Sequence, residues 1–362
     1  MTDTSPPSVQ RLTWIRWSCT TALGLSLWCA GAALAFDAQG HRGARGLAPE
    51  NTIAGFERAL AVGVSTLELD VVLSAEGVPV ISHDTTANPD ITRDARGQWL
   101  QARSQPFRRL RLTEIAAWDV GRINPASRYA RDFPQQVARD GQGIPTLAAL
   151  FERVRQLGAR HVRFNIELKL NPARPEESPD PQTFVHAVLD VIAAHGMTHR
   201  VGLQSFDWRI QKVARQLAPG MPLAYLSAQL PRFNTLASGE WTAGLRLADF
   251  EDAPAMVAAA GGKLWSPHFG DLDQRQLQRA RELELRVVPW TVNELQDMAR
   301  LIDWGVDGII TDYPDRLRTV MGRRGMALPP RIVLPPATEQ ERSSAAAPMP
   351  ERVPFGVAPD LR

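Results

Sequence analysis

Two carboxylates, Glu68 and Asp70, stand in the apolar run STLELDVVL at residues 65–73. Residues two apart in a strand point to the same face, and two buried carboxylates on one face repel each other unless a cation holds them. Carboxylate oxygens are the ligands that Mg2+ and Ca2+ prefer. The pair therefore predicts a site for one divalent cation. The alternative is that one carboxylate caps a loop while the other is solvated.

Glu167 and Lys169 repeat this spacing in HVRFNIELKL at residues 161–170. Taken alone, they are equally consistent with a local ion pair in a strand. Beside Glu68 and Asp70, however, Glu167 completes a set of three carboxylates, and Lys169 can hold an anionic oxygen. A cation and a lysine in one site would stabilise the charge on a transferring phosphoryl group.

His41 and His83, two of the seven histidines, each stand beside a predicted strand end among charged neighbours. Because imidazole titrates near neutral pH, one histidine can accept a proton while the other donates one. A lone histidine beside a loop is more often structural or solvated. Arg42 offers a forked donor for phosphate, Gly43 lets a ligand approach the backbone, and Glu50 can orient Arg42 or His41.

The elements that must position these residues alternate along the chain from Phe36 onward. Apolar runs predict strands at 36–41, 65–73, 161–170, 200–206, 221–228, 262–269, 285–293 and 307–313. Segments of helical period predict helices at 51–63, 145–158, 181–196, 207–218, 252–262, 273–284 and 293–305. Eight strands with intervening helices predict an α/β fold of the TIM (β/α)8 barrel type, in which the active site lies at the C-terminal ends of the strands. The competing architecture is a doubly wound open sheet, but HRGARG lacks the G-x-G-x-x-G spacing that it would favour.

Two stretches interrupt this alternation. Residues 85–143 are polar and rich in arginine and turn residues, which predicts an insertion or lid after the second strand of a barrel that spans residues 36–322. Thr146 is a candidate helix cap where the barrel pattern resumes. Residues 323–362 are rich in proline and predict a mostly disordered tail, with a docking segment as the alternative.

Residues 1–35 carry the features of a signal peptide. Arg11 and Arg16 precede an apolar stretch, and residues 33–35 form a small-residue cleavage site. This predicts export, to the periplasm in a Gram-negative bacterium and otherwise to the medium, with no membrane span in the mature chain. An uncleaved anchor is the alternative. Both cysteines, Cys19 and Cys29, fall in this segment, so the remainder has no disulfide, thiol nucleophile or cysteine metal site. A net charge of +2 gives no reason to expect a nucleic-acid partner.

Short motifs around these residues occur in a characteristic order. They are His41-Arg42-Gly43, Pro49-Glu50-Asn51-Thr52, Glu68-Leu69-Asp70-Val71, His83-Asp84, Glu167-Leu168-Lys169, Gln204-Ser205-Phe206, Trp290-Thr291-Val292-Asn293 and Gly305-Val306-Asp307-Gly308. In this order they resemble the glycerophosphodiester phosphodiesterase family over residues 39–317. The resemblance implies a TIM barrel with an insertion after the second strand, and metal-dependent hydrolysis of glycerophosphodiesters such as glycerophosphocholine to sn-glycerol 3-phosphate and an alcohol.

The resemblance also implies a role for each matching residue. These roles are metal binding by Glu68, Asp70 and Glu167, acid and base catalysis by His41 and His83, phosphate binding by Arg42 and Lys169, and substrate lining by Gln204 and Trp290. His41 is favoured as the base. A phospholipase acting on intact phospholipids and a non-catalytic binding protein are the rival functions. The leaving alcohol, the choice between Ca2+ and Mg2+, and the oligomeric state stay open.

Overall fold

A computed structural model of the 362-residue chain describes residues 1–2 and 35–336. The predicted signal segment therefore lies almost wholly outside the described residues, and so does the tail from residue 337. Among the helices in the described part of the chain, none is both long enough and apolar enough to cross a membrane.

Eight parallel strands form the barrel within residues 35–336. They are β1 (Asp37–Gly40), β2 (Thr66–Leu73), β4 (Arg163–Leu168), β5 (Val201–Ser205), β6 (Leu223–Ser227), β9 (Leu264–Pro267), β10 (Arg286–Val287) and β11 (Gly308–Thr311). They pair in the order β10-β9-β6-β5-β4-β2-β1-β11. The Ile310 amide donates to the Pro289 carbonyl at 3.0 Å, and the Val292 amide donates to the Ile310 carbonyl at 3.0 Å, which joins the two ends of this order. The predicted TIM barrel is confirmed, and every predicted strand region holds one of these strands.

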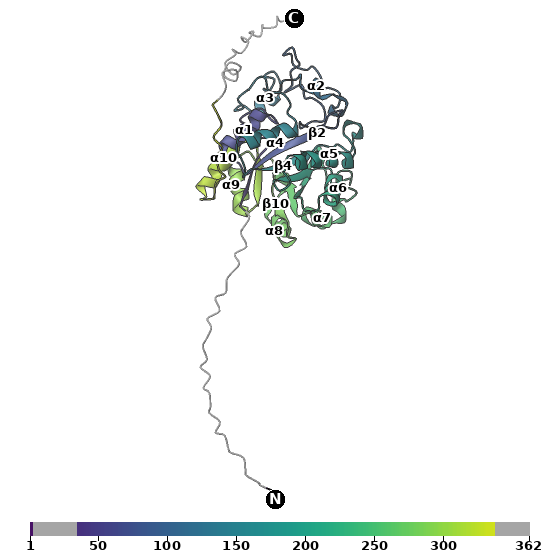
Figure 1. The fold of residues 1–362 in the computed structure, drawn as a ribbon, viewed down its shortest axis with the longest axis vertical. Coiled ribbons are helices and arrows are strands. Elements are labelled where there is room, and N and C mark those ends of the chain that lie inside the picture. The colour runs from purple at the N-terminus through teal and green to yellow at the C-terminus, as the bar shows by residue number, and fades with distance from the viewer. Residues whose placement is uncertain (3–34, 337–362) are drawn as a thin grey trace, which may run out of the picture. The chain divides into compact units, whose positions relative to one another are not determined.

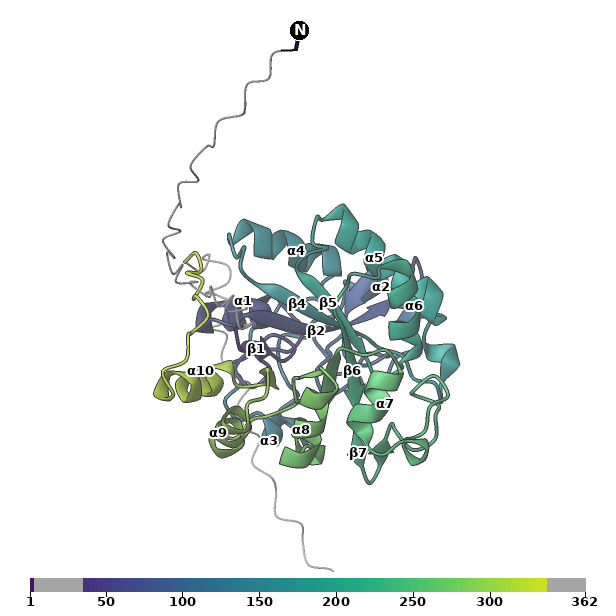
Figure 2. The same ribbon diagram turned by 90° about the horizontal axis from the view of Figure 1, so that it is seen from below.

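Helices surround the strands, as the view in Figure 2 shows. They are α1 (Ile53–Val62), α4 (Leu147–Gln156), α5 (Pro181–Ala194), α6 (Arg209–Leu217), α7 (Ala253–Ala259), α8 (Gln274–Glu282), α9 (Leu295–Trp304) and α10 (Pro314–Arg323) (Figure 1). The Thr146 hydroxyl caps α4 as predicted, accepting from the Ala149 amide at 3.1 Å. The sequence analysis missed α10, which begins at a proline directly after the last barrel strand.

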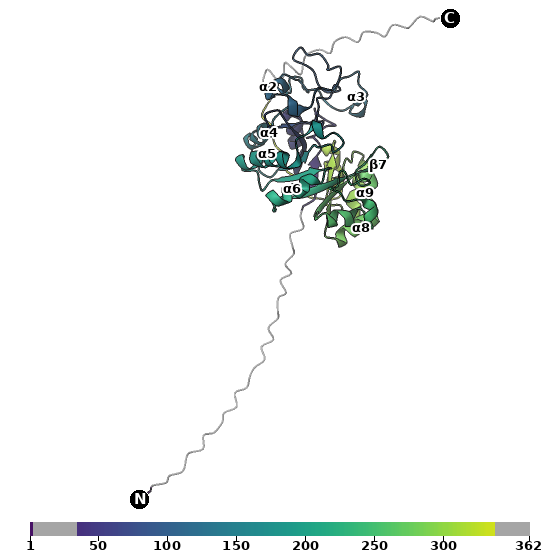
Figure 3. The ribbon, with the colours of Figure 1, turned by 90° about the vertical axis from the view of Figure 1, so that its right-hand side faces the viewer.

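The second strand is followed by a hairpin and then by the insertion. β3 (Pro79–Ile81) pairs antiparallel with β2, and it is followed by the 3-10 turn η1 (Phe107–Arg109) and the short helices α2 (Leu112–Ile115) and α3 (Tyr129–Asp132). Figure 3 places α2 and α3 at one end of the barrel. Val80, Phe107 and Ile115 belong to a small apolar cluster. The segment predicted as a polar lid therefore has a core of its own.

Smaller elements complete the loops of the barrel. They are η2 (Pro175–Glu177), β7 (Gln229–Leu230), β8 (Phe233–Asn234), η3 (Leu247–Asp249) and η4 (Phe269–Asp271). β7 and β8 form an antiparallel hairpin between β6 and α7. This hairpin lies in a segment for which the sequence analysis predicted no element.

The first part of the proline-rich tail packs on the barrel. The Ile332 amide donates to the Leu60 carbonyl at 3.0 Å, and the Ile332 side chain packs against the core cluster that contains Leu60. Arg318 Nη1 donates to the Pro329 carbonyl at 2.6 Å. Burial of an apolar side chain and hydrogen bonds to the backbone thus hold Pro329 and Ile332 against the barrel.

Candidate active site

The predicted site residues converge at the mouth of the barrel. A cavity of about 150 Å³ is lined by seven of the nine, namely His41, Arg42, Glu68, His83, Glu167, Gln204 and Trp290. The other two contact these seven: Lys169 Nζ lies 2.7 Å from Glu167 Oε1, and Asp70 Oδ2 lies 3.4 Å from Arg42 Nε. They meet because the C-terminal ends of parallel barrel strands form one rim.

Three buried carboxylates form a cluster that we call the acidic floor; Glu68 and Glu167 line the cavity, and Asp70 lies beside them. Asp70 of β2 lies in register with Glu167 of β4, and Glu68 stands two residues before Asp70. One oxygen from each lies within 4.8 Å of the others, and the residues are only 1%, 1% and 7% exposed for Glu68, Asp70 and Glu167. Gln204 Nε2 donates to Glu68 Oε1 at 2.8 Å, and Asn51 Nδ2 donates to Asp70 Oδ2 at 2.9 Å. The carboxylates are therefore held in fixed orientations.

The charges of this cluster are not balanced by protein groups alone. Burial and repulsion from Asp70 raise the pKa of Glu68 well above its usual range. Burial and the charge of Asp70 also raise the pKa of Glu167 to about 7, although Lys169 opposes this shift. In addition, Asp70 Oδ1 is buried without a hydrogen-bond partner. A divalent cation would satisfy that oxygen and remove the repulsion, so the three residues fit such an ion.

Two cations of the protein face the carboxylates. Burial alone would lower the pKa of Lys169, but Glu167 and Asp70 outweigh it, and the net effect is a raised pKa. Arg42 has a left-handed backbone with φ of +48°, and this lets its amide donate to Glu68 Oε2 at 2.8 Å. Arg42 Nη1 donates to Glu50 Oε1 at 2.7 Å, which confirms that Glu50 orients Arg42.

Gly43 serves the packing of α1. Its φ is +87°, and a Cβ at this position would lie 2.7 Å from the carbonyl carbon of Gly55 in α1. The expectation that Gly43 opens the backbone to a ligand stays a prediction, beside this packing role. The glycine is needed because the loop turns sharply there while touching the helix.

His41 is held in a buried network. Its Nδ1 lies 2.7 Å from Asp312 Oδ1, and its Nε2 lies 3.9 Å from Glu68 Oε2. Arg45 donates to both oxygens of Asp312 at 2.8 and 2.9 Å, and Asn293 Nδ2 donates to Asp312 Oδ2 at 2.8 Å. Burial would raise the pKa of Asp312, but Arg45 and His41 hold it well below its usual range. Because an ionised carboxylate only accepts, Nδ1 of His41 carries the proton and Nε2 is left as an acceptor.

His83 stands on the same cavity in a more open position. Its Nδ1 lies 2.8 Å from Asp84 Oδ1, and its side chain is 36% exposed. Burial of the imidazole, together with the charges of Arg42 and Lys169, lowers the pKa of His83 to about 4. Burial likewise lowers the pKa of His41. Both histidines are therefore neutral at pH 7 before an anion enters the cavity.

The insertion contributes to the site through Tyr129. The Tyr129 hydroxyl donates to Glu50, and Arg45 Nη1 donates to the Tyr129 oxygen at 3.2 Å. The Arg45 guanidinium also lies 4.5 Å from the ring centroid of Phe133. The sequence analysis missed Arg45 and Tyr129, for which it had no signal. Asp312 falls near the end of the strand predicted at residues 307–313, which is the one signal available for that residue.

Gln204 and Trp290 differ in their surroundings. Gln204 donates to Glu68 and accepts from Asn165 Nδ2 at 2.9 Å, so its amide supports a carboxylate of the floor. Trp290 Nε1 donates to the Ser266 carbonyl at 3.0 Å, and its ring packs edge to face with Phe206 at 5.2 Å between centroids. Trp290 thus forms part of an aromatic wall of the cavity.

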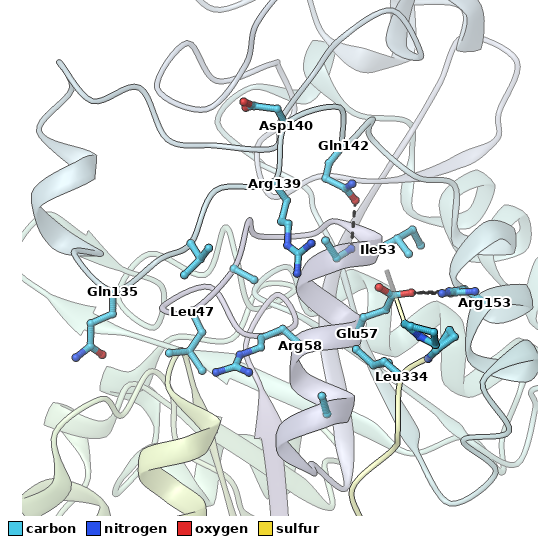
Figure 4. A pocket seen from close by; sticks show the side chains of 16 residues that line it. Leu47, Ile53, Glu57, Arg58, Gln135, Arg139, Asp140, Gln142, Arg153 and Leu334 are labelled. Carbon is cyan, nitrogen blue, oxygen red and sulfur yellow. Dashed lines mark hydrogen bonds and ion pairs between the residues drawn. The ribbon is translucent and has the colours of Figure 1, made fainter. Parts of the chain in front are cut away.

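Two of the other cavities in the described part of the chain bear on this cluster by comparison. One of about 240 Å³ adjoins it beneath the insertion and shares Arg42, Arg45 and His83. A much larger one, of about 790 Å³, lies beside α1 and is lined by none of the predicted site residues (Figure 4). Arg58 and Arg139 line this second cavity, while Arg153 Nε donates to Glu57 Oε1 at 2.5 Å. We call it the α1 flank cavity.

Two relatives of known sequence match most of this chain. The chain is 29% identical over 283 residues to a glycerophosphodiester phosphodiesterase of Bacillus subtilis (strain 168), with 77% of this chain and 84% of the relative covered. It is 27% identical over 289 residues to a glycerophosphodiester phosphodiesterase of Caldanaerobacter subterraneus subsp. tengcongensis, with 79% and 97% covered.

Solved structures share the fold, and a family model matches most of the chain. A protein of Silicibacter pomeroyi DSS-3 named as a glycerophosphoryl diester phosphodiesterase is 37% identical, with a TM-score of 0.73 over 81% of this chain and 95% of that one. An Oleispira antarctica phosphodiesterase, solved with the product sn-glycerol-3-phosphate, shares the fold at 22% identity and a TM-score of 0.58, over 79% and 96%. The model of the glycerophosphoryl diester phosphodiesterase family matches residues 41–316. The chain therefore belongs to the glycerophosphoryl diester phosphodiesterase family.

Proposed function

We propose that this enzyme hydrolyses glycerophosphodiesters such as glycerophosphocholine to sn-glycerol 3-phosphate and an alcohol, with one divalent cation at Glu68, Asp70 and Glu167. The observation that carries the proposal is the meeting of two histidines, Arg42, Lys169 and these carboxylates around one cavity. When bound, the cation would neutralise charge on the phosphoryl oxygens. Arg42 and Lys169 supply further positive charge beside the position of the phosphodiester.

His41 acts as the general base in this scheme. Asp312 accepts from Nδ1, so Nε2 is the atom that takes a proton from the nucleophile, which is a water molecule or the glycerol hydroxyl next to the phosphate. Arg45 and Asn293 fix Asp312 and thereby fix the imidazole. The strong ion pairing of Asp312 keeps it ionised throughout the reaction.

His83 acts as the general acid. Its low pKa arises partly from Arg42 and Lys169, and a bound phosphodiester anion offsets their charge and favours the protonated imidazole. The half-open position of His83 suits a group that faces the departing alcohol. If the glycerol hydroxyl attacks first, a second step would exchange the roles of the two histidines.

The three ligands leave both Ca2+ and Mg2+ open. Both ions take carboxylate oxygens, but Mg2+ demands near-octahedral geometry and keeps more water ligands. Export would favour Ca2+, since that ion is more available outside the cytoplasm. Adding back each metal to the EDTA-treated enzyme and comparing the concentrations that restore half of the activity would identify the ion.

A small water-soluble diester fits the site better than an intact phospholipid. The two adjoining cavities at the barrel mouth measure about 150 and 240 Å³, so neither alone reaches the range of about 300–1,000 Å³ that is typical of pockets for drug-sized ligands. The phospholipase alternative therefore remains only as an outcome of the product-release assay. Hydrolysis of lysophosphatidylcholine in that assay would support it.

We also propose export of the protein, on the strength of the signal-like sequence at residues 1–35. The test is the mass of the purified natural protein, which should correspond to a chain beginning near Phe36. A mass that retains residues 1–35 would instead support the uncleaved anchor.

The products identify the reaction directly. Phosphorus NMR of glycerophosphocholine incubated with the purified protein should show conversion to glycerol 3-phosphate, with choline released. Formation of phosphocholine and glycerol would place cleavage on the other side of phosphorus and contradict the proposal.

A further inference from the structure

Four aromatic rings form a wall beside the catalytic cavity. Phe206 and Trp290 line the cavity itself. Phe233 of β8 and Trp241 from the following loop extend the wall outward, since each contacts Phe206, with centroids 5.2 and 6.4 Å apart. All four side chains are partly exposed. We call these four residues the aromatic wall.

The rings contact one another edge to face. Phe206 and Phe233 lie at 69° to each other, Phe206 and Trp241 at 83°, and Phe233 and Trp241 at 85°. Trp290 stands at 84° to Phe206. These are edge-to-face contacts between rings that stay partly exposed, and the exposed faces of aromatic rings are the surfaces by which proteins bind quaternary ammonium groups.

Core packing does not explain the aromatic wall. None of its four residues belongs to a hydrophobic core cluster of the described chain. The wall is nevertheless well anchored, because the Trp241 carbonyl accepts from the Trp208 amide at 2.7 Å and Trp290 donates to Ser266. The buried Thr235 also ties the hairpin to β6, its amide donating to the Ala228 carbonyl at 2.9 Å. Such preorganisation favours ligand binding.

The wall already lies beside one cation. Lys169 Nζ lies 5.9 Å from the centroid of Phe206, within the range of a cation–π contact. Phe233 and Trp241 do not line the cavity, but each contacts Phe206, which does. A substituent that leaves the cavity along Phe206, away from a phosphate at Lys169, would reach these two rings.

We propose that the aromatic wall binds a trimethylammonium group, and that it selects choline esters among the glycerophosphodiesters. This inference rests on the proposed function and names its leaving alcohol. Phe233 and Trp241 are its specificity-determining residues, because they meet the leaving group while the histidines, arginine and carboxylates act on the phosphodiester.

The test compares two esters that differ in charge but not in shape. Glycerophosphocholine is compared with the glycerophosphate ester of 3,3-dimethylbutanol, in which carbon replaces the ammonium nitrogen. The full-length enzyme should show a kcat/KM about 5- to 30-fold higher for the choline ester, the size of a desolvated cation–π contact. In Phe233→Leu and Trp241→Leu, this ratio should fall to about twofold or less.

Two further variants make the test decisive. Trp241→Phe keeps a ring and should retain most of the preference, even if Trp241→Leu folds poorly. Trp304→Leu removes a partly buried tryptophan of α9 that lines neither cavity at the barrel mouth, and it should change neither rate. Circular dichroism of each variant reports folding.

The possible results separate this inference from the proposed function. Equal rates for the two esters in the wild-type enzyme would overturn the inference while leaving the proposed function intact. An unchanged ratio in Phe233→Leu and Trp241→Leu would overturn the assignment to these rings. Hydrolysis of neither ester, with Ca2+ or Mg2+ present, would contradict the proposed function and this inference with it.

Discussion

The cavity at the barrel mouth and the α1 flank cavity differ in how far their charged side chains are exposed to solvent. The mouth cavity measures about 150 Å³, yet its charged side chains are buried and locked to one another. The flank cavity measures about 790 Å³, but Arg58 on its lining is exposed. Buried charges interact strongly because little solvent screens them, whereas exposed ones are weakened by water and salt. The proposed catalytic site is thus distinguished by confinement of charge and not by cavity size.

The largest effect on activity is expected when one charge is removed from the acidic floor. We expect Asp70→Asn, which keeps the shape of the side chain, to lower kcat/KM about 1,000-fold, because a cation supplies several kcal/mol of charge stabilisation. The measurement is glycerol 3-phosphate release with metal in excess. A loss of less than about tenfold would show that Asp70 does not hold the cation.

The next largest effect concerns the two histidines. His41→Ala and His83→Ala should each lower turnover by about 100-fold or more while leaving the fold intact, because each removes a proton-transfer group. The matched control is His161→Ala, which changes an exposed histidine away from the cavity and should have little effect. Near-normal turnover in both His41→Ala and His83→Ala would end the two-histidine mechanism.

A smaller loss is expected where a residue acts through His41. Asp312→Asn removes the charge that fixes the imidazole, and we expect kcat to fall about 10- to 100-fold with little change in KM. Steady-state kinetics separate the two constants. An equal rise in KM without loss of kcat would mean that Asp312 shapes the substrate site instead of positioning the base.

The raised pKa values predict how metal binding depends on pH. Since the pKa of Glu167 is about 7 without metal, this carboxyl binds a proton below pH 7, and the cation must displace it. Affinity for Ca2+ or Mg2+ should therefore fall about fivefold from pH 7 to pH 6, as calorimetric titration can measure. Affinity that does not change over this range would show that Glu167 is already ionised.

The smallest effect is expected at the α1 flank cavity. Arg58→Ala and Arg139→Ala should leave turnover of glycerophosphodiesters within about twofold of wild type, because neither residue lines the mouth cavity. The same product-release assay applies. A tenfold or greater loss of turnover in either variant would show that the α1 flank cavity affects the reaction at the barrel mouth, and would contradict the separation of the two cavities.

The barrel could be predicted because its signals are local. Each buried parallel strand is a continuous apolar run, and the charged residues near its C-terminal end mark the rim. β3, β7 and β8 escaped prediction because they have only two or three residues each and, unlike the equally short β10, lie outside the alternation of strands and helices that gave the sequence signal. Ile332 also escaped, since its packing on Leu60 depends on a contact distant in sequence.

In the site, too, single residues could be predicted from local sequence, but contacts between distant residues could not. Glu68, Asp70 and Glu167 were found because their spacing in apolar strands is unusual. The partnership of His41 with Asp312 could not be found, because it joins residues 271 positions apart and exists only once β1 pairs with β11. Tyr129 reaches the site from the insertion, whose polar sequence gave no sign of which side chain turns inward.

The most direct test of the central claim is release of glycerol 3-phosphate from glycerophosphocholine by the purified enzyme, first with EDTA and then with Ca2+ or Mg2+ added back. We predict that EDTA abolishes release, that one of the two ions restores it, and that neither ion restores it in Asp70→Asn. Undiminished release in EDTA, or equal recovery in Asp70→Asn, would contradict the assignment of catalysis to a cation held by the buried carboxylates of the barrel mouth.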